Sequence, residues 1–385
     1  MNFRPNSIVL KLLVAAEKPG YNSRVIESNF WQTLTRPIVG LSPMDGVSDQ
    51  PFRHIHCKYG GPDVVYTEFT NVEGVCHGAT KLLRDFLYDE SQRPIIAQIY
   101  GITPSYFYQV AVVLAELGFD GVDINMGCPA KNVANSGAGA ALIKNPALAR
   151  EIIKQTKAGL HDWSNGLELE GCPDISAKII TEVRLRQQLL PKHRLTRRLL
   201  PLSVKTRLGY NESSVESWIP QLLDTGIEAL AVHGRTLSQG YSGLADWSEI
   251  GHVGQLAEGS GVKIIGNGDV ESRQDAEYKT SLYGLDGALI GRASLGNPLV
   301  FTDHYDQLSQ DSSAIWPILK KIALEHARLY EKTYQGEPLY AFMPMRKHLG
   351  WYVRGVEGAK QLRIALFKAN SSQDVEEILY GSMVE

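Results

Sequence analysis

The chain has 385 residues, of which 43% are hydrophobic and 21% charged, and its net charge is −3. A chain of this size can bury one large core and carry a smaller second domain, and its charge excludes a polycation that binds nucleic acid over its whole surface. Its four cysteines, Cys57, Cys76, Cys128 and Cys172, form no C-x-x-C pair and no metal-ligand spacing. We therefore predict no metal site and a reducing, cytoplasmic setting.

Residues 1–27 precede the first strand-like segment. The apolar run at residues 7–16 resembles part of a signal peptide, but Lys11 interrupts it and it is too short to span a bilayer. We interpret residues 1–27 as an extra helix or a loose extension. No other stretch approaches a transmembrane length, so we expect no membrane association.

From residue 28 onward, short β-rich runs alternate with helical patterns, which is typical of βα units around a parallel sheet. Eight runs predict the strands of an α/β fold, a closed (β/α)8 TIM barrel over residues 28–302: Ile38–Met44, Val64–Phe69, Pro94–Tyr100, Gly121–Gly127, Leu202–Leu208, Ala229–Arg235, Val262–Asn267 and Gly287–Gly291. Helical patterns long enough for right-handed crossovers lie between them: Pro104–Leu117, Pro146–Ala158, Glu216–Thr225 and Ser272–Tyr283.

Two segments extend beyond a plain barrel. Residues 159–201 are longer than one barrel connection, and we interpret them as an insertion. Nine Lys or Arg lie between Lys178 and Arg207 against the single acid Glu182, which indicates either a solvated face or a phosphate-binding surface. After the last strand, amphipathic patterns predict a smaller all-helical domain over residues 303–385, with helices at Ser313–Thr333, Leu339–Val353, Gly358–Lys368 and Ser372–Gly381.

The segment Asp123–Lys131 places Cys128 at the end of an apolar strand. Free cysteines are usually small buried hydrophobes, but Gly127 and Pro129 break regular structure on both sides. We therefore expect an exposed thiol at a turn. Because reactive groups in a barrel of this class lie at the C-terminal ends of the strands, Cys128 is the predicted reactive residue.

Polar groups follow other strands at the same end of the predicted barrel. Glycine turns at Gly268 and Gly291 would present backbone N–H groups to a phosphate, with Arg292 adding charge; the alternative is that these glycines only make tight turns. Lys205 and Arg207 point to one face of their strand. Because buried unpaired cations are costly, we expect both to meet an anion, a carboxylate or a developing negative charge, with His233 beside them.

The motifs at these strand ends resemble those of the tRNA-dihydrouridine synthases, in the same order and at fitting intervals. They are Pro43–Val47, Thr67–Phe69, Gln98–Gly101, Asn125–Pro129, Val204–Arg207, His233–Thr236, Gly266–Asp269 and Gly291–Ala293. The resemblance implies an enzyme that reduces the C5–C6 bond of particular uridines in tRNA. It also implies FMN as the bound cofactor and NADPH as the reductant.

The resemblance also implies residue roles. FMN would be held by Pro43, Met44, Asp45, Gln98, Lys205, His233, Asn267, Gly268, Asp269, Gly291 and Arg292. Asn125, Lys205 and Arg207 would face the uracil, and Cys128 would be the general acid. Since the acid must protonate C5, Cys128 has to be a neutral thiol rather than a thiolate.

The predicted helical domain carries Arg346, Lys347, Arg354, Lys360 and Arg363 around Trp351 and Tyr352. These residues are either a solvated helix face over an aromatic core stripe or phosphate contacts, and the resemblance implies that this domain holds tRNA. Two rival hypotheses are an FMN barrel reductase of a free pyrimidine, similar to dihydroorotate dehydrogenase, and a tRNA-binding protein without catalysis. We predict a monomer, and the uridine position stays open.

Overall fold

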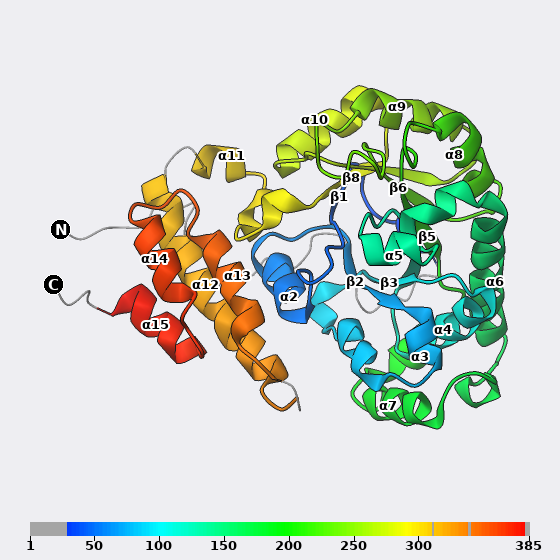
Figure 1. Ribbon diagram of the computed structural model, residues 1–385, viewed down its shortest axis with the longest axis horizontal. Helices are drawn as coiled ribbons and strands as arrows, with labels where there is room; N and C mark the ends of the chain where they lie inside the picture. Colours follow the sequence, from blue (N-terminus) through cyan, green and yellow to red (C-terminus); the bar gives the residue numbers. More distant parts are fainter. Residues whose placement is uncertain (1–28, 310–311, 338–339, 382–385) are drawn as a thin grey trace.

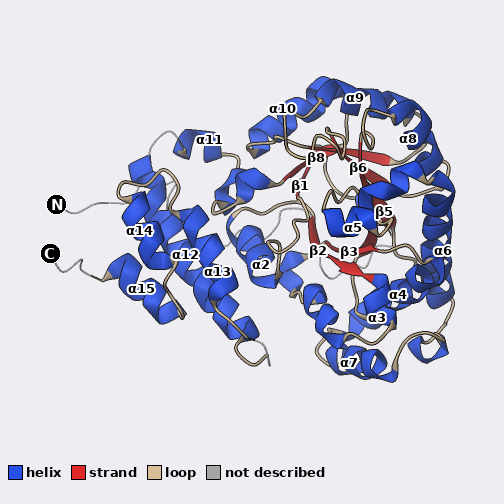
Figure 2. Cartoon of the chain, in the orientation of Figure 1, coloured by secondary structure: helices blue, strands red, loops and turns tan. Residues whose placement is uncertain are grey.

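The computed structural model describes residues 29–309, 312–337 and 340–381, so the predicted extension at 1–27 lies outside it. Within these ranges eight parallel strands close into a barrel in which each strand pairs with its sequence neighbours and β8 returns to β1 (Figure 2). The strands are β1 (Ile38–Leu41), β2 (Val65–Asn71), β3 (Ile95–Tyr100), β4 (Gly121–Met126), β5 (Leu202–Arg207), β6 (Ala229–His233), β7 (Lys263–Asn267) and β8 (Gly287–Ile290). The predicted (β/α)8 barrel is confirmed.

Helices connect the strands, and most of them surround the barrel, whereas α5 lies in front of the ring of strands in the view of Figure 1. They are α2 (Gln50–Tyr59), α3 (Val72–Cys76), α4 (Pro104–Glu116), α5 (Lys131–Asn135), α6 (Pro146–Ser164), α7 (Ala177–Gln187), α8 (Val215–Leu223), α9 (Trp247–Leu256) and α10 (Arg273–Tyr283). Five of these helices were not predicted from the sequence: α2, α3, α5, α7 and α9. Two of them, α2 and α9, begin at an aspartate N-cap, since Asp49 accepts from the N–H of Phe52 and Asp246 from that of Glu249.

The barrel interior is filled by side chains at its N-terminal end. Tyr66, Ile96 and Leu289 form a buried cluster with Phe30 and Trp31 of the short η1 helix (Phe30–Gln32). These aromatic residues pack against the strand starts, since a Cβ atom on Gly121 would lie 3.2 Å from the Phe30 ring. The end of the barrel where the strands begin is therefore closed, and a site can form only at the other end.

At that other end, β1 stops at Leu41, earlier than the predicted Met44. The N–H of Met44 donates to Ser48 Oγ at 2.9 Å, and the Ser48 hydroxyl donates back to the Met44 carbonyl at 3.1 Å. This reciprocal pair makes a tight turn after Leu41. Residues 42–44 therefore line the open end of the barrel as a loop.

The C-terminal helices lie beside the barrel, next to α2 (Figure 1). They are α11 (Tyr305–Leu308), α12 (Ser312–Tyr334), α13 (Met343–Tyr352), α14 (Ala359–Leu366) and α15 (Ser372–Tyr380). α13 begins at Met343, later than the predicted Leu339, which lies outside the described residues. Their buried apolar residues form one cluster with Ile55 and Tyr59 of α2 and with Leu299.

The described residues lack two features that are typical of other classes of protein. Among those residues, no helix is both long and apolar enough to cross a membrane. The same residues contain no group of three or more His, Cys, Asp or Glu side chains placed to hold a metal ion.

Candidate active site

A cavity of about 930 Å³ opens at the C-terminal ends of the strands. The predicted site residues that line it are Pro43, Met44, Asp45, Asn125, Cys128, Lys205, Arg207, His233, Asn267, Gly268, Asp269, Gly291 and Arg292. Gln98 differs, because it is fully buried and lies below the cavity wall. Residues from six strand ends therefore converge on one cavity, as expected for a barrel.

One part of the wall is made of backbone N–H groups, which we term the amide cradle. Its members follow β7 and β8, line the cavity and have no hydrogen-bond acceptor among the described residues: Gly268, Asp269, Val270, Gly291, Arg292 and Ala293. The φ angles of Gly268 and Asp269 are 120° and 49°, a conformation in which successive N–H groups can face one side. The amide cradle therefore suits a phosphate group.

Asp269 supports this region through its side chain. Its carboxylate accepts from Arg235 Nη2 at 2.6 Å, from Arg292 Nη2 at 2.7 Å and from the N–H of Ala245 at 2.8 Å. The Arg292 guanidinium also lies 5.0 Å from the centre of the Tyr241 ring. Asp269 can thus offer a ligand anion only its backbone N–H, while its carboxylate holds Arg292 in place.

Lys205 and His233 lie between the amide cradle and β4. Among the described residues no acceptor lies within hydrogen-bond or ion-pair distance of Lys205 Nζ, and this side chain is half-buried beside the cavity. Burial, together with the charge of Arg207, lowers the pKa of Lys205 to about 8. Burial and the nearby cations lower the pKa of His233 far below its usual value, so its imidazole is neutral.

Arg207 was expected to meet an anion, but in the structure it donates to backbone carbonyls. Its Nε donates to the carbonyl of Gly127 at 2.7 Å, and its Nη1 donates to the carbonyls of Thr236 and Gly240 at 3.0 and 3.2 Å. Protein carbonyls thus satisfy most of this guanidinium. Arg207 ties the loop after β4 to the loop after β6.

The thiol of Cys128 is almost completely buried, so the prediction of an exposed thiol is wrong. The residue is 8% exposed, because Val133 of α5 and Ala138 pack over it from the loop that follows. Burial raises the pKa of the thiol more than the Ala130 N–H and the charges of Arg207 and Lys205 lower it. Cys128 is therefore a neutral thiol at neutral pH.

The sequence analysis did not identify every lining residue. Tyr241 and Leu244 reach the cavity from the loop between β6 and α9 and are 62% and 84% exposed. Their signal in the sequence is weak, since they are two apolar side chains beside Gly240 and Gly243 in a polar loop. They form part of the outer rim of the cavity.

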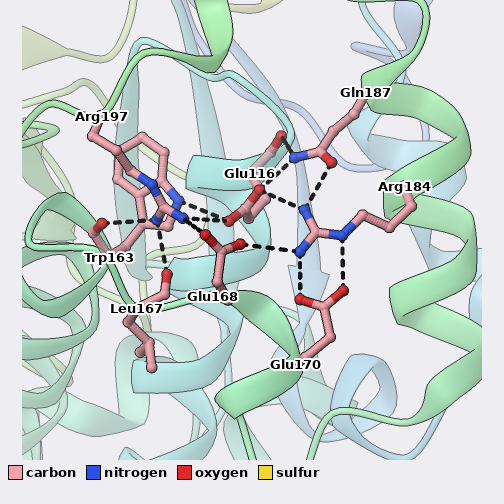
Figure 3. A network of polar contacts seen from close by, with 8 residues as sticks. All are labelled: Glu116, Trp163, Leu167, Glu168, Glu170, Arg184, Gln187 and Arg197. Carbon is pink, nitrogen blue, oxygen red and sulfur yellow. Dashed lines mark hydrogen bonds and ion pairs between the residues drawn. The ribbon is translucent and has the colours of Figure 1, made fainter.

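Four of the nine basic residues between Lys178 and Arg207 form ion pairs with acids, namely Arg184, Arg186, Arg194 and Arg197, and Figure 3 shows the contacts of Arg184 and Arg197. Arg184 pairs with Glu168 and Glu170, and its Nη1 lies 3.0 Å from a carboxylate oxygen of Glu116. Arg197 Nη2 lies 2.8 Å from Glu168 and 3.4 Å from Glu116. Glu116 belongs to α4, so these arginines bind the segment to the barrel.

Other arginines of this stretch are also paired. Arg186 Nε lies 2.7 Å from Glu182, and the buried Arg194 lies 3.4 Å from both Asp120 and Glu90. Counting charges within one sequence window missed the acids supplied by α4 and by the loops. These pairs reduce the positive charge of the segment, and a phosphate-binding surface here stays a prediction. α6 also continues to Ser164, past the predicted start of the insertion.

A family model described as Dihydrouridine synthase (Dus) matches residues 40–162 and 173–383. The chain belongs to the dihydrouridine synthase family. This membership confirms the predicted class, a flavin-dependent oxidoreductase. Only residues 163–172 interrupt the match, a shorter segment than the predicted insertion at 159–201.

Two bacterial relatives match the chain over most of its length. "Probable tRNA-dihydrouridine synthase 2" of Bacillus subtilis (strain 168) is 33% identical over 356 residues, which are 91% of this chain and 95% of the relative. "Probable tRNA-dihydrouridine synthase" of Staphylococcus epidermidis is 32% identical over 359 residues, 92% of this chain and 96% of the relative. Among solved structures, DHODH of Eimeria tenella in complex with ferulenol has a TM-score of 0.47 at 17% identity, covering 83% of this chain and 93% of that one.

Proposed function

We propose that this member of the dihydrouridine synthase family reduces the C5–C6 bond of specific uridines in tRNA, with FMN bound in the cavity and NADPH as the electron donor. The observation that supports this most directly is the arrangement of groups around the ring of strands. The amide cradle follows β7 and β8, whereas Cys128 follows β4, which lies opposite β8 in an eight-stranded ring. An anion site and a neutral thiol thus face each other across one cavity.

The residues present fit FMN. The amide cradle and Arg292 would hold its phosphate, as helix and loop N–H groups after the last two strands do in other barrels. Lys205, half-buried and without an acceptor among the described residues, would donate to an oxygen of the ring system, with His233 beside it. Pro43, Met44 and Asn267 would complete the wall. Gln98 does not line the cavity, so it would support the site through its hydrogen bond with Asn125 rather than by contact with FMN.

Reduced FMN would supply a hydride to C6 of the uracil. Cys128 gives its Sγ proton to C5, so that two hydrogens add across one double bond and the negative charge developing towards the C4 carbonyl is neutralised. Arg207 Nη2, for which the described residues offer no acceptor, can donate to a uracil oxygen. The thiolate left on Cys128 takes a proton from solvent before the next cycle.

The tRNA would be held by the helical domain. Arg346, Lys347, Arg354, Lys360 and Arg363 form no ion pair with a carboxylate among the described residues, in contrast to the arginines near α7. His348 and Tyr352, which lie among them in the sequence, are buried in the domain core. These unpaired cations support contacts to the phosphate backbone.

We also propose a cytoplasmic location, which the four free cysteines support. That the chain acts as a monomer stays a prediction.

The test is to incubate purified protein with an unmodified tRNA transcript and NADPH and to map dihydrouridine by mass spectrometry. We expect product at one or a few positions, none without NADPH, and none from free uridine or orotate. A yellow protein that oxidises NADPH but leaves tRNA unchanged would contradict the proposal and favour a reductase of another substrate.

A further inference from the structure

Below the cavity, buried hydrogen bonds connect three adjacent strands and end at the loop that carries Cys128. Ser203 Oγ of β5 donates to Asp123 Oδ1 at 2.6 Å, and Gln98 Nε2 of β3 donates to Asp123 Oδ2 at 2.8 Å. Asn125 Nδ2 donates to Gln98 Oε1 at 3.0 Å. Asn125 Oδ1 then accepts from the N–H groups of Gly127 and Cys128 at 3.1 and 2.8 Å.

The direction of this chain of bonds is set at Asp123. Burial raises the pKa of Asp123 to about 6, so its carboxyl is ionised at neutral pH and can only accept. Gln98 must therefore turn its NH2 group towards Asp123 and its oxygen towards Asn125. Asn125 in turn must donate to Gln98, which leaves its oxygen for the two N–H groups of the loop.

The same loop is held from a second side. Arg207 Nε donates to the carbonyl of Gly127 at 2.7 Å, while Asn125 accepts from the N–H groups of Gly127 and Cys128. Both polar groups of Gly127 and the N–H of Cys128 are thus fixed by side chains that lie on β4 and β5. A reversed Asn125 amide would place its NH2 group against the two N–H groups and release one side of the loop.

We propose that Asp123 is a positioning residue for proton transfer: through Gln98 and Asn125 it fixes the loop that holds the Cys128 thiol against the substrate. This inference rests on the proposed function. Neither Asp123 nor Ser203 lines the cavity. Gln98 and Asn125, predicted as ligand contacts, use both ends of their amide groups within this chain of bonds.

The test compares Asp123→Ala with Asp123→Asn, and adds Gln98→Met. Asn keeps an oxygen for Gln98, and the Ser203 hydroxyl can turn to accept from its new NH2 group. Ala removes the acceptor. Gln98→Met interrupts the series of hydrogen bonds between Asp123 and Asn125 while leaving Asp123 and Ser203 in place. If Asp123→Ala does not fold, this variant tests the proposed role of Asp123. Thermal unfolding shows which variants are folded.

The first measurement needs no catalysis. FMN-free protein is treated with iodoacetamide, and modification of Cys128 is followed by peptide mass spectrometry. Because a loosened loop exposes the thiol and removes the burial that raises its pKa, we expect several-fold faster alkylation in Asp123→Ala and Gln98→Met and a wild-type rate in Asp123→Asn. Equal alkylation rates in wild type and the three variants would overturn the inference, and so would equal rates in Asp123→Asn and Asp123→Ala. Because this measurement needs no catalysis, its outcome does not depend on the proposed function.

The second measurement separates the two half-reactions by stopped flow. Reduction of the flavin by NADPH does not use Cys128 and should be unchanged, whereas reoxidation by tRNA should slow by about 10- to 100-fold in Asp123→Ala and Gln98→Met. Equal losses in both half-reactions would mean that Asp123 acts on the flavin site as a whole, and would overturn a role specific to the loop.

Discussion

Lys205 is half-buried at the cavity wall and has no hydrogen-bond acceptor among the described residues. Its pKa of about 8 lies below its usual 10.5, so the unfolded chain binds this proton more tightly than the folded protein does. The resulting cost to folding is fully present below about pH 8 and is relieved as the pH rises towards 10.5. A ligand oxygen beside Nζ would remove the same cost, so we expect Lys205 to favour binding at the expense of stability.

Replacing Lys205 by Met tests whether this side chain strengthens FMN binding and lowers the stability of the FMN-free protein. We expect the variant to release FMN more easily, with affinity lower by about 10- to 100-fold, the loss expected when a charge-assisted hydrogen bond is removed. The FMN-free variant should have a higher thermal midpoint than FMN-free wild type. Fluorescence titration and thermal unfolding measure the two effects, with the exposed Lys178→Met as the control. Unchanged FMN affinity would show that Lys205 does not contact the cofactor.

The sequence could predict which residues line the cavity but not what each one contacts. Cys128, Lys205 and Gly268 were predictable because they lie in or just after the C-terminal ends of strands, and strand ends in a barrel converge. The contacts of Arg207 with carbonyls after β6, and of Asp269 with Arg292, depend on partners in other loops. A pattern in neighbouring residues of the sequence does not show these contacts between separate loops.

At the scale of elements, α7 and the segment before it are fastened to α4 through Glu116. This side chain is 6% exposed and accepts from Trp163 Nε1 at 3.1 Å and from Gln187 Nε2, in addition to pairing with Arg184 and Arg197 (Figure 3). Trp163 lies in the segment that the family model leaves unmatched. The network therefore explains how this segment is held against α4 at the outside of the barrel.

Changing Glu116 to Gln should weaken this attachment. The new NH2 group would face guanidinium N–H groups, so we expect the free energy of unfolding to fall by about 1–3 kcal/mol. Chemical denaturation measures the loss. Glu151→Gln on the exposed side of α6, where the carboxylate meets only Gln155 and Lys154, should change it by less than about 0.5 kcal/mol. Equal effects of the two changes would contradict the role given to Glu116.

Hydrophobic periodicity does not explain which helices were predicted. All eight strands were found because each is a short, largely buried run between turns or helical segments. α2 and α9 were missed although their apolar residues recur on one face and their aspartate N-caps are visible in the sequence. The start of α13 was placed too early because hydrophobic periodicity does not show at which residue a helix begins.

At the scale of the whole molecule, the helical domain lies beside the barrel and shares a hydrophobic cluster with α2 (Figure 1). Lys347 reaches the carbonyl of Gly46 in the loop after β1, next to cavity-lining residues. The sequence predicted the domain from its helical patterns. Its place beside α2 depends on Ile55 and Tyr59, whose burial against other helices no pattern shows.

If this domain holds tRNA, its unpaired cations should set the salt dependence of binding. We expect Arg354→Gln combined with Arg363→Gln to weaken tRNA binding and to reduce the slope of log Kd against log salt by about 1 per lost phosphate contact. Filter binding at several salt concentrations measures the slope. Lys178→Gln and Lys192→Gln, near α7, should leave it unchanged. A larger effect at those lysines would place the tRNA on the other side of the barrel.

The most direct test of the account is a single-turnover reaction of Cys128→Ala. Wild type and variant, each loaded with FMN and reduced with dithionite, are mixed with unmodified tRNA, and dihydrouridine is quantified by mass spectrometry. Because the buried neutral thiol is the proposed acid, we expect the variant to bind FMN and tRNA normally but to form product about 100- to 10,000-fold more slowly. Product formation at the wild-type rate would contradict the assignment of Cys128.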